Sequence, residues 1–395
     1  MIKYLNEPVL RKYEGKICLL RIDLNNISRL EAVVPTIKLL LKNGIKIVLL
    51  SHRGRPSFAK ATAGKPHSVD KKLSLRSFVP ILSRKLRKRV RFVSNFRFAI
   101  IKKEIVKSEN GVFLLENLRF LPGEEKNDIK FARRLAGLGD FYVNDAFAVS
   151  HRKNASVVAI TKFLPSYAGL LMEKEIKSLD AVMKNFKHPF TVIIGGAKIS
   201  DKIGIIKHFW GSASRRKADY FLLGGSPANT FFMAQGLPVG DSLADRKTIP
   251  SIKKYLKNRK IILPSDVKIK RRRILDIGER TVLWYSTIIR KSRTVIWNGP
   301  MGMFEKKEFA SGTKGIWQAV SKNKRAKIVV GGGETVASLA RITRIHTDKN
   351  GLIRIKHPHK SAKISTNPRL FLSTGGGAML EYLSGKKLPG IEALK

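Results

Sequence analysis

The sequence predicts an α/β protein with two domains, each built on a parallel β-sheet. Four apolar runs in the second half open directly into glycine pairs or triplets, and four in the first half end in aspartate, histidine or arginine. These runs alternate with segments of helical spacing, as expected for parallel sheets covered by helices. At 395 residues the chain is too long for one small core. Residues 172–186 have helical spacing and lie between the two halves, so they predict an interdomain helix.

The first half is predicted to alternate strands and helices. Strands are expected at 16–24, 46–50, 91–93, 111–115 and 141–143, and helices at 30–41, 73–88 and 131–138. The first of these helices is closed by Asn43-Gly44, a pair suited to a helix C-terminus. Residues 57–72 are polar and contain glycine and proline, so they predict a loop.

Charged side chains follow the predicted strands of the first half. Asp23 lies at the end of the first strand, and the second runs into Ser-His-Arg-Gly-Arg-Pro at 51–56. Arginine forks bind phosphate or carboxylate in bidentate fashion, so this segment favours an anion site over its alternative, a solvated basic loop. Convergence of five arginines would build a positive pocket for a small anionic metabolite: Arg21, Arg29, Arg55, Arg119 and Arg152.

The second half centres on residues 190–206. A β-branched run at 190–194 is broken by Gly195 and Gly196, and helical spacing begins at Ser200. Lys198 and Lys202 are four residues apart and can reach toward one phosphate chain at the helix N-terminus. The alternative is an ordinary turn between strand and helix.

Further glycine turns at 224–225, 331–333 and 375–377 follow apolar runs. Ligands of open parallel sheets bind beyond the carboxyl ends of the strands, so these turns predict one shared crevice. The sequence has no Walker Gly-x-x-x-x-Gly-Lys-Ser/Thr, no Gly-x-Gly-x-x-Gly, and no His-Arg-Asp or Asp-Phe-Gly pair. These absences exclude three common nucleotide-binding families.

The composition is strongly basic, with 78 Lys and Arg against 29 Asp and Glu and a formal net charge of +49. A polyanion site needs roughly five to ten cations, so most of this charge lies elsewhere. Two interpretations remain, a solvated surface shaped by compositional bias and nonspecific association with RNA or acidic surfaces. The single cysteine, Cys18, lies in an apolar run and fits a reducing compartment. No signal peptide or membrane-spanning run is evident, so a cytoplasmic protein is expected.

Ten segments in order resemble phosphoglycerate kinases. Those of the first half are Arg-Ile-Asp-Leu-Asn at 21–25, Ser-His-Arg-Gly-Arg-Pro at 51–56, Leu-Glu-Asn-Leu-Arg-Phe at 115–120 and Val-Asn-Asp-Ala-Phe at 143–147, with His151-Arg152. Those of the second half are Gly-Gly-Ala-Lys-Ile-Ser-Asp-Lys at 195–202, Leu-Pro-Ser-Asp-Val at 263–267, Asp-Ile-Gly at 276–278, Trp-Asn-Gly-Pro-Met-Gly-Met-Phe-Glu at 297–305, Gly-Gly-Gly-Glu-Thr at 331–335 and Ser-Thr-Gly-Gly-Gly-Ala at 373–378. Each motif alone is weak, but chance does not produce all ten in this order.

The resemblance implies two Rossmann-like domains with parallel sheets that face a hinged cleft. It implies a substrate domain at 1–168 with 378–395 packing back on it, an interdomain helix at 169–187, and a nucleotide-binding domain at 188–377. The implied reaction is reversible phosphoryl transfer from 1,3-bisphosphoglycerate to MgADP, giving 3-phosphoglycerate and ATP. A monomer is also implied.

The resemblance also assigns residues to the two sites. The 3-phosphoglycerate substrate would be held by Asp23, Asn25, Arg29, His52, Arg55, Arg119 and Arg152. The nucleotide would be surrounded by Gly196, Lys198, Lys202, Asn298, Pro300, Glu305, Gly331, Gly332, Gly333, Glu334, Thr335, Gly375 and Gly376. Arg29, Lys198 and Lys202 would be catalytic, and Glu334 would lie near Mg²⁺, indirectly or through the nucleotide.

This chemistry needs no general base, because a carboxylate or nucleotide phosphate oxygen is already ionised at neutral pH. Catalysis should depend on in-line positioning and on neutralising charge on the moving phosphoryl group. His52 and His151 are therefore interpreted as hydrogen-bonding groups rather than proton shuttles. Domain closure would bring substrate and nucleotide together and exclude water.

Three departures from the family pattern stand out. Glu334 replaces the usual aspartate, only residues 26–28 separate Asn25 from Arg29, and residues 266–276 are compressed while 340–369 are extended. Two rival interpretations follow. One is a catalytically weakened relative that binds RNA or an acidic partner through its basic surface. The other is a kinase for a different acyl phosphate.

Overall fold

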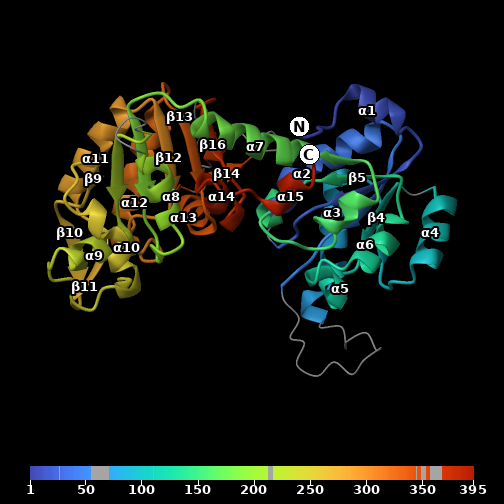
Figure 1. Ribbon diagram of the computed structural model, residues 1–395, viewed down its shortest axis with the longest axis horizontal. Helices are drawn as coiled ribbons and strands as arrows, with labels where there is room; N and C mark the ends of the chain where they lie inside the picture. Colours follow the sequence, from blue (N-terminus) through green and yellow to red (C-terminus); the bar gives the residue numbers. More distant parts are fainter. Residues whose placement is uncertain are drawn as a thin grey trace. The chain divides into compact units, whose positions relative to one another are not determined.

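The computed structural model describes residues 1–25, 27–54, 71–109, 111–211, 217–343, 345–347, 353–355 and 367–395. The chain divides into two compact units, which are described separately. Unit 1 contains Met1–Glu175 and Lys387–Lys395, and unit 2 contains Ile176–Lys386. Figure 1 shows a parallel sheet and its surrounding helices in each unit, with both chain ends in unit 1. None of the described helices is both long and apolar enough to cross a membrane.

The sheet of unit 1 has the strand order β3-β4-β2-β1-β5-β6, and every neighbouring pair is parallel. Its strands are β1 (Ile17–Arg21), β2 (Lys46–Leu50), β3 (Arg91–Val93), β4 (Val112–Leu115), β5 (Phe141–Asn144) and β6 (Ser166–Ala168). All residues of β1, β4 and β5 are buried. Burial on both faces explains why these strands are continuous apolar runs.

The helices of unit 1 cover this sheet and form its core with the strands. They are α1 (Glu7–Lys12), α2 (Ile27–Lys42), α3 (Val79–Leu86), α4 (Phe98–Lys107), α5 (Pro122–Glu125), α6 (Ile129–Ala136) and α15 (Pro389–Glu392). Helix α7 (Leu170–Met183) begins in unit 1, and the division between the units falls inside it, after Glu175. Leu30, Val33 and Ile37 of α2 pack into the main core cluster with Leu20 and Leu49 of the sheet.

Unit 2 repeats the same plan, with the strand order β16-β13-β12-β7-β8-β9 and parallel neighbours throughout. Its strands are β7 (Phe190–Ile194), β8 (Tyr220–Leu223), β9 (Ile261–Ile262), β12 (Thr294–Asn298), β13 (Lys327–Gly331) and β16 (Leu370–Leu372). Trp297, Trp317 and Tyr285 are the largest side chains of its core cluster.

Seven helices and two antiparallel strand pairs accompany this sheet among the described residues. The helices are α8 (Ile203–Trp210), α9 (Gly225–Ala234), α10 (Ile249–Ile252), α11 (Glu279–Lys291), α12 (Ser311–Lys322), α13 (Gly333–Thr343) and α14 (Gly377–Leu383). The strand pairs are β10 (Val267–Lys270) with β11 (Arg273–Ile277), and β14 (Ile345–Thr347) with β15 (Ile353–Ile355).

Each sheet has a topological switch point, where the chain turns from one side of the first strand to the other. In unit 1 the chain builds β2, β3 and β4 on one side of β1 and then places β5 on the other. In unit 2 it builds β8 and β9 on one side of β7 and then places β12 on the other. Ligands of such sheets bind beyond the carboxyl ends of the strands at this point.

Two structural details differ from the sequence expectations, and one further expectation lies largely outside the described residues. The predicted helix at 73–88 begins as two 3₁₀ turns, Lys71–Leu73 and Leu75–Phe78, and only Val79–Leu86 is α-helical. Pro80 fixes this α-helix start, because proline lacks the N–H that the helix interior requires. The loop expected at 57–72 lies largely outside the described residues, and its last residues belong to the first 3₁₀ turn. The returning C-terminal segment is Lys387–Lys395, and residues 378–386 belong to unit 2.

Candidate active site

The carboxyl ends of β1 and β2 in unit 1 bring together a network of polar side chains. Arg29 Nη1, from α2, lies 2.6 Å from Asp23 Oδ2. Asn25 donates from Nδ2 to Asp23 Oδ1 at 2.7 Å and accepts at Oδ1 from the Gly54 N–H at 3.1 Å. Asp23 is only 4% exposed. The network therefore holds the residues after β1 and β2 in one rigid arrangement.

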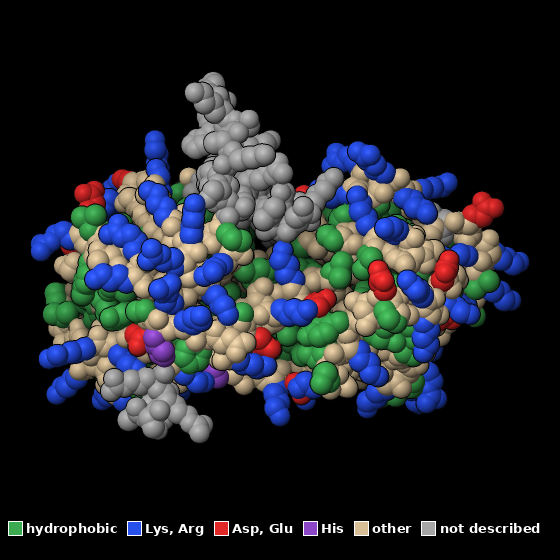
Figure 2. All heavy atoms as spheres, turned by 90° about the horizontal axis from the view of Figure 1, so that it is seen from above, with side chains coloured by type: hydrophobic (Ala, Val, Ile, Leu, Met, Phe, Trp, Pro, Cys, Tyr) green, Lys and Arg blue, Asp and Glu red, His purple; other side chains and the backbone are tan. Residues whose placement is uncertain are grey.

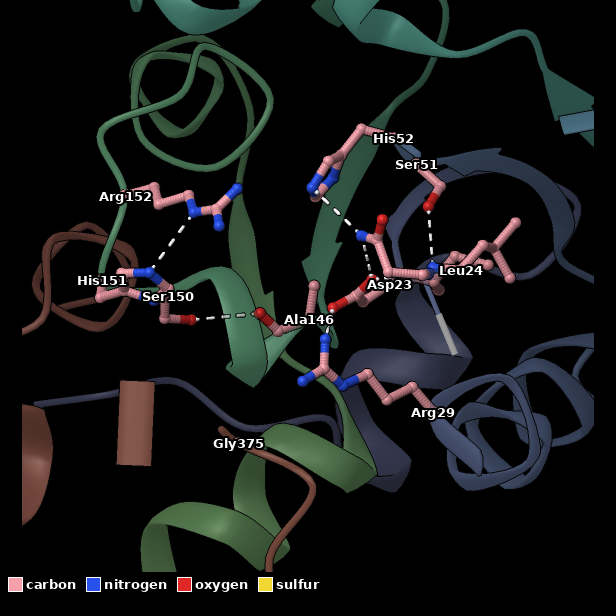
Figure 3. Close-up of polar contacts among 12 residues, drawn as sticks. Asp23, Leu24, Arg29, Ser51, His52, Ala146, Ser150, His151, Arg152 and Gly375 are labelled. Carbon is pink, nitrogen blue, oxygen red and sulfur yellow. Dashed lines mark hydrogen bonds and ion pairs between the residues drawn. The ribbon is translucent and has the colours of Figure 1, made fainter. Parts of the chain in front are cut away.

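His52 lies at the centre of this group and is buried. Burial and the positive charges of Arg21, Arg119, Arg152 and Arg29 hold the pKa of His52 well below its usual range. The four guanidinium groups thus converge on one imidazole, although they come from four separate segments. Figure 3 shows the guanidinium of Arg152 pointing toward the side on which His52 lies, and Arg29 pointing at Asp23.

Arg119 and Arg152 follow β4 and β5, the strands that flank the central pair. Arg119 is buried, donates from Nη1 to the Gly54 carbonyl, and lies 3.2 Å through Nε from Glu125 Oε1. Arg152 donates from Nε to His151 Nε2 at 3.3 Å. Arg55, which the sequence also places in this site, lies outside the described residues. The remaining predicted substrate residues of unit 1 lie around His52 or in its network.

In unit 2 the glycine turns after β7, β8 and β12 are hydrogen-bonded to one another. Gly195 N–H donates to the Asn298 carbonyl at 2.9 Å, and Gly196 N–H donates to the Pro300 carbonyl at 2.7 Å. A Cβ at Gly195 would overlap the Pro300 carbonyl, and a Cβ at Gly299, where φ is +92°, would overlap Gly195. Only glycine permits this approach of two backbones at the switch point.

The turn after β13 joins this group through two buried side chains. Thr335 Oγ1 accepts from Gly299 N–H at 2.7 Å and donates to the Gly331 carbonyl at 2.8 Å. Asn298 Nδ2 donates to the same carbonyl at 2.8 Å. Asn298 and Thr335 therefore hold the glycine turns together. Gly332 lies between β13 and α13, Gly333 is the first residue of α13, and Gly375 and Gly376 lie between β16 and α14.

Lys202, directly before α8, and Glu334, in α13, both lie close to the glycine turn at 195–196. A Cβ at Gly196 would lie 2.9 Å from Glu334 Oε2 and 3.5 Å from Lys202 Nζ. Lys202 is buried and donates from Nζ to the Lys198 carbonyl at 2.9 Å, whereas Lys198 itself is exposed. Burial lowers the pKa of Lys202, while the nearby charges of Glu334 and Asp201 raise it. An ammonium group and a carboxylate thus flank the glycine turn at 195–196.

A cavity of about 280 Å³ opens beside these turns, entirely within unit 2. Four predicted nucleotide residues line it: Gly196, Pro300, Glu305 and Glu334. Most of its wall was not predicted from the sequence, including Ser226, Asn229, Leu243, Ile274 and Leu275. These residues are mostly apolar and give no motif signal. An apolar wall with a few polar groups is typical of a small-molecule site.

Magnesium would have to share its coordination with the nucleotide at this site. Among the described residues no group of three or more His, Cys, Asp or Glu side chains could hold a metal ion. Glu334 offers a carboxylate beside the glycine turn. Mg²⁺ is commonly bound by one or two carboxylates together with substrate phosphates, so the residues present fit such an ion.

The comparisons with known proteins all find the same family, and each match covers almost the whole chain. The family model described as phosphoglycerate kinase matches residues 10–386. The phosphoglycerate kinase of Chloroflexus aggregans is 38% identical, with 99% of each chain covered, and that of Thermomicrobium roseum is 39% identical, with 93% of this chain and 91% of the relative covered. Solved structures of phosphoglycerate kinases from Coxiella burnetii and Pyrococcus horikoshii have TM-scores of 0.76 and 0.77, at 31% and 30% identity. Each comparison covers 97% of this chain and 96% of the other.

Proposed function

Because the chain belongs to the phosphoglycerate kinase family, we propose that it transfers a phosphoryl group reversibly from 1,3-bisphosphoglycerate to MgADP, giving 3-phosphoglycerate and ATP. The observation that carries this proposal is the division of the two sites. Guanidinium groups gather around His52 in unit 1, and glycine turns gather around Lys202 and a cavity in unit 2. One unit thus suits a small polyanion and the other a nucleotide.

In unit 1 the glycerate substrate would lie against the group centred on His52. Arginine side chains bind carboxylate and phosphate with two parallel hydrogen bonds, and their convergence compensates a doubly or triply charged ligand. The residues proposed to hold it are Asp23, Asn25, Arg29, His52, Arg55, Arg119 and Arg152. The Asp23 carboxylate orients Arg29, since the two are 2.6 Å apart.

In unit 2 the base and ribose of the nucleotide would occupy the cavity, because its wall is largely apolar. Gly196 and Glu334 line the cavity and lie close to Lys202, so the phosphates would extend toward these residues. Lys198 is exposed and can swing toward the same phosphates. Asn298 and Thr335 hold together the glycine turns that would face these phosphates.

Catalysis would depend on charge neutralisation and alignment, since neither reacting oxygen needs a proton removed. Lys202, Lys198 and Arg29 would neutralise charge on the transferred phosphoryl group. Glu334 together with the nucleotide would hold Mg²⁺, which would supply further positive charge at the site. In-line transfer requires the acyl phosphate and the β-phosphate of ADP to meet, so we propose that the units close during the reaction.

Three further expectations complete the proposal. The enzyme would act as a monomer in the cytoplasm, where the buried free thiol of Cys18 stays reduced. Its basic surface would associate weakly and nonspecifically with nucleic acids, since Figure 2 shows Lys and Arg spread over the whole face drawn. That association would be secondary to catalysis, because it does not involve the cavity of unit 2.

The test is ATP formation from MgADP and freshly generated 1,3-bisphosphoglycerate by the purified full chain. Lys202→Ala is expected to lower kcat at least about 100-fold, because it removes a preorganised positive charge beside the glycine turn at 195–196. Lys207→Ala is the matched control, since Lys207 lies on α8 and is exposed. A folded wild-type protein without turnover would refute the proposal. Equal effects of the two substitutions would refute the role of Lys202.

A further inference from the structure

Four buried polar side chains form a continuous hydrogen-bonded chain that ends at the His52 ring in unit 1. Ser156 Oγ donates to Glu124 Oε1 at 2.6 Å, and Arg21 Nε donates to Ser156 Oγ at 2.9 Å. Arg21 Nη2 then lies 2.7 Å from His52 Nδ1. Glu124, Ser156, Arg21 and His52 are all at most 3% exposed. Glu124 and Ser156 have no role in the substrate site proposed above, and Arg21, one of the five arginines of the predicted anion pocket, is not among the residues proposed to hold the substrate.

The direction of every hydrogen bond in this chain is fixed by chemistry. An arginine guanidinium is always charged and has only donors, so His52 Nδ1 must accept. Ser156 has one hydroxyl hydrogen, and the Glu124 carboxylate takes it, leaving a lone pair on Oγ for Arg21. Glu124 is further held by the Ser156 N–H at 2.9 Å. A neutral imidazole with an accepting Nδ1 carries its hydrogen on Nε2.

The Nε2 atom faces a second donor. Asn25 Nδ2 lies 3.3 Å from His52 Nε2. The orientation of this amide is set independently, because Nδ2 donates to Asp23 Oδ1 and Oδ1 accepts from Gly54 N–H. If Nε2 also accepted, the ring would have to be an imidazolate, which its surroundings do not require. Two N–H groups therefore converge on the space between them, an arrangement that an oxygen acceptor would satisfy.

Building on the glycerate site proposed above, we propose that Arg21 is a positioning residue that fixes His52 as the neutral Nε2–H tautomer. His52 Nε2–H and Asn25 Nδ2–H then form a two-donor clamp for one oxygen of the anionic substrate. The buried Glu124 carboxylate and Ser156 hydroxyl hold Arg21 in the orientation that this tautomer requires. The clamp is present before the ligand arrives, so no proton has to move on binding.

The charges around the ring agree with this assignment. Arg21 from β1, Arg29 from α2, Arg119 from the turn after β4 and Arg152 from the segment after β5 all disfavour an imidazolium. The opposite charges nearby are themselves engaged, since Asp23 is paired with Arg29, Glu125 with Arg119, and Glu124 accepts from Ser156. Together with burial, these cations keep the pKa of His52 well below its ordinary value. The clamp should therefore keep the same protonation state over the range in which a free histidine titrates.

The tautomer can be read directly, without any ligand. Long-range ¹H–¹⁵N NMR spectra of the full chain labelled with [¹⁵N]histidine distinguish a protonated ring nitrogen from an accepting one. The His52 signals are assigned by their loss in His52→Gln. We expect a protonated Nε2 and an accepting Nδ1 from about pH 5 to pH 8, where an ordinary histidine changes charge. A proton on Nδ1, or titration near the ordinary pKa, would overturn the proposal.

Substitutions test the role of Arg21 and its support. Ser156→Ala removes the hydroxyl that orients Arg21, and we expect 3-phosphoglycerate affinity to fall about tenfold, as for one lost charge-assisted hydrogen bond. Ser166→Ala, at a half-buried serine of unit 1 outside this hydrogen-bonded chain, is the control. Arg21→Met removes the donor to Nδ1, so we expect part of the His52 population to carry its proton on Nδ1 in the NMR spectra. Unchanged spectra in a folded Arg21→Met protein would refute the positioning role.

A second pair of variants separates the two ring nitrogens. The side-chain amide of His52→Gln places an N–H near the position of Nε2, whereas that of His52→Asn places it near Nδ1. We expect His52→Gln to retain more 3-phosphoglycerate affinity than His52→Asn in calorimetry, and the reverse order would contradict the clamp. If the wild-type protein bound no 3-phosphoglycerate, the proposed substrate would be wrong, while the ligand-free NMR result would still decide the tautomer.

Discussion

Asp145 combines deep burial with a structural hydrogen bond, and its ionisation therefore affects stability. It follows β5, is 1% exposed, and accepts at Oδ1 from the Met172 N–H at 2.9 Å in the first turn of α7. Burial raises the pKa of Asp145 to about 7. The folded chain thus binds a proton that the unfolded chain has already released at pH 5 to 6.

This pKa shift predicts a loss of stability as the pH rises. The contribution of Asp145 is full below the unfolded pKa near 4, and it declines as the pH passes toward 7, by an amount on the order of 1–3 kcal/mol. Asp145→Asn keeps an acceptor for Met172 and removes the ionisation. We expect the variant to lose less free energy of unfolding than wild type between pH 5 and pH 8, as measured by urea denaturation.

The control for this prediction is Asp128→Asn. The Asp128 side chain also accepts a hydrogen bond from a helix N–H, that of Phe131 at 2.6 Å, but Asp128 is exposed to solvent whereas Asp145 is buried. Asp276, whose pKa is raised to about 6 by burial, and His52, whose pKa is lowered, contribute equally to variant and wild type and cancel in the comparison. An identical pH dependence in Asp145→Asn and wild type would show that Asp145 does not titrate in this range.

The hairpin of β10 and β11 carries an unusual turn. Lys270 pairs with Arg273, and the two residues between them, Arg271 and Arg272, have φ of 47° and 58°. A two-residue hairpin with left-handed backbone at both positions favours Asn-Gly, because most other side chains are strained there. Lys268 and Lys270 add further positive charge to the same hairpin. The two arginines in this turn therefore lower the stability of the hairpin.

Replacing the turn by its preferred residues should stabilise unit 2. Arg271→Asn with Arg272→Gly is expected to add about 1 kcal/mol, or roughly 2–4 °C in Tm by calorimetry. The exposed Arg272–Asp241 ion pair is lost, which matters little. Lys257→Asn with Arg259→Asn removes two exposed charges elsewhere and should raise Tm less. Equal gains would assign the effect to net charge instead of backbone strain.

Strands and their ends could be predicted from the sequence better than this hairpin or the cavity. β2, β3 and β7 have the predicted bounds. For β2 and β7 the reason is that largely buried strands are short apolar runs with clear breaks. Asp23 and His52 could be named as candidate site residues because they lie at or just after the ends of apolar runs. Helix α4 was not predicted. The cavity wall at Leu243 and Ile274 was not predicted either, because apolar side chains give the same sequence signal in a core and in a binding site.

The net charge of the whole molecule has a measurable consequence. Its 29 acidic side chains can neutralise at most 29 of its 78 Lys and Arg, so 49 positive charges repel one another across the folded surface. We expect Tm to rise between about 0.1 M and 1 M NaCl, as the Debye length falls from about 10 Å to about 3 Å. Potassium chloride should act equally. A Tm that falls with both salts would show that ion pairs outweigh repulsion.

The return of Lys387–Lys395 to unit 1 also sets an order of events during synthesis. These residues bury Leu388, Ile391 and Leu394, and Gly390 N–H donates to the Ser150 carbonyl at 2.8 Å. A ribosome makes them only after all of Ile176–Lys386, which at typical elongation rates takes on the order of tens of seconds. During synthesis, the surface of unit 1 beside Ser150 and Val157 therefore stays exposed to solvent until Lys387–Lys395 have been made and pack against it.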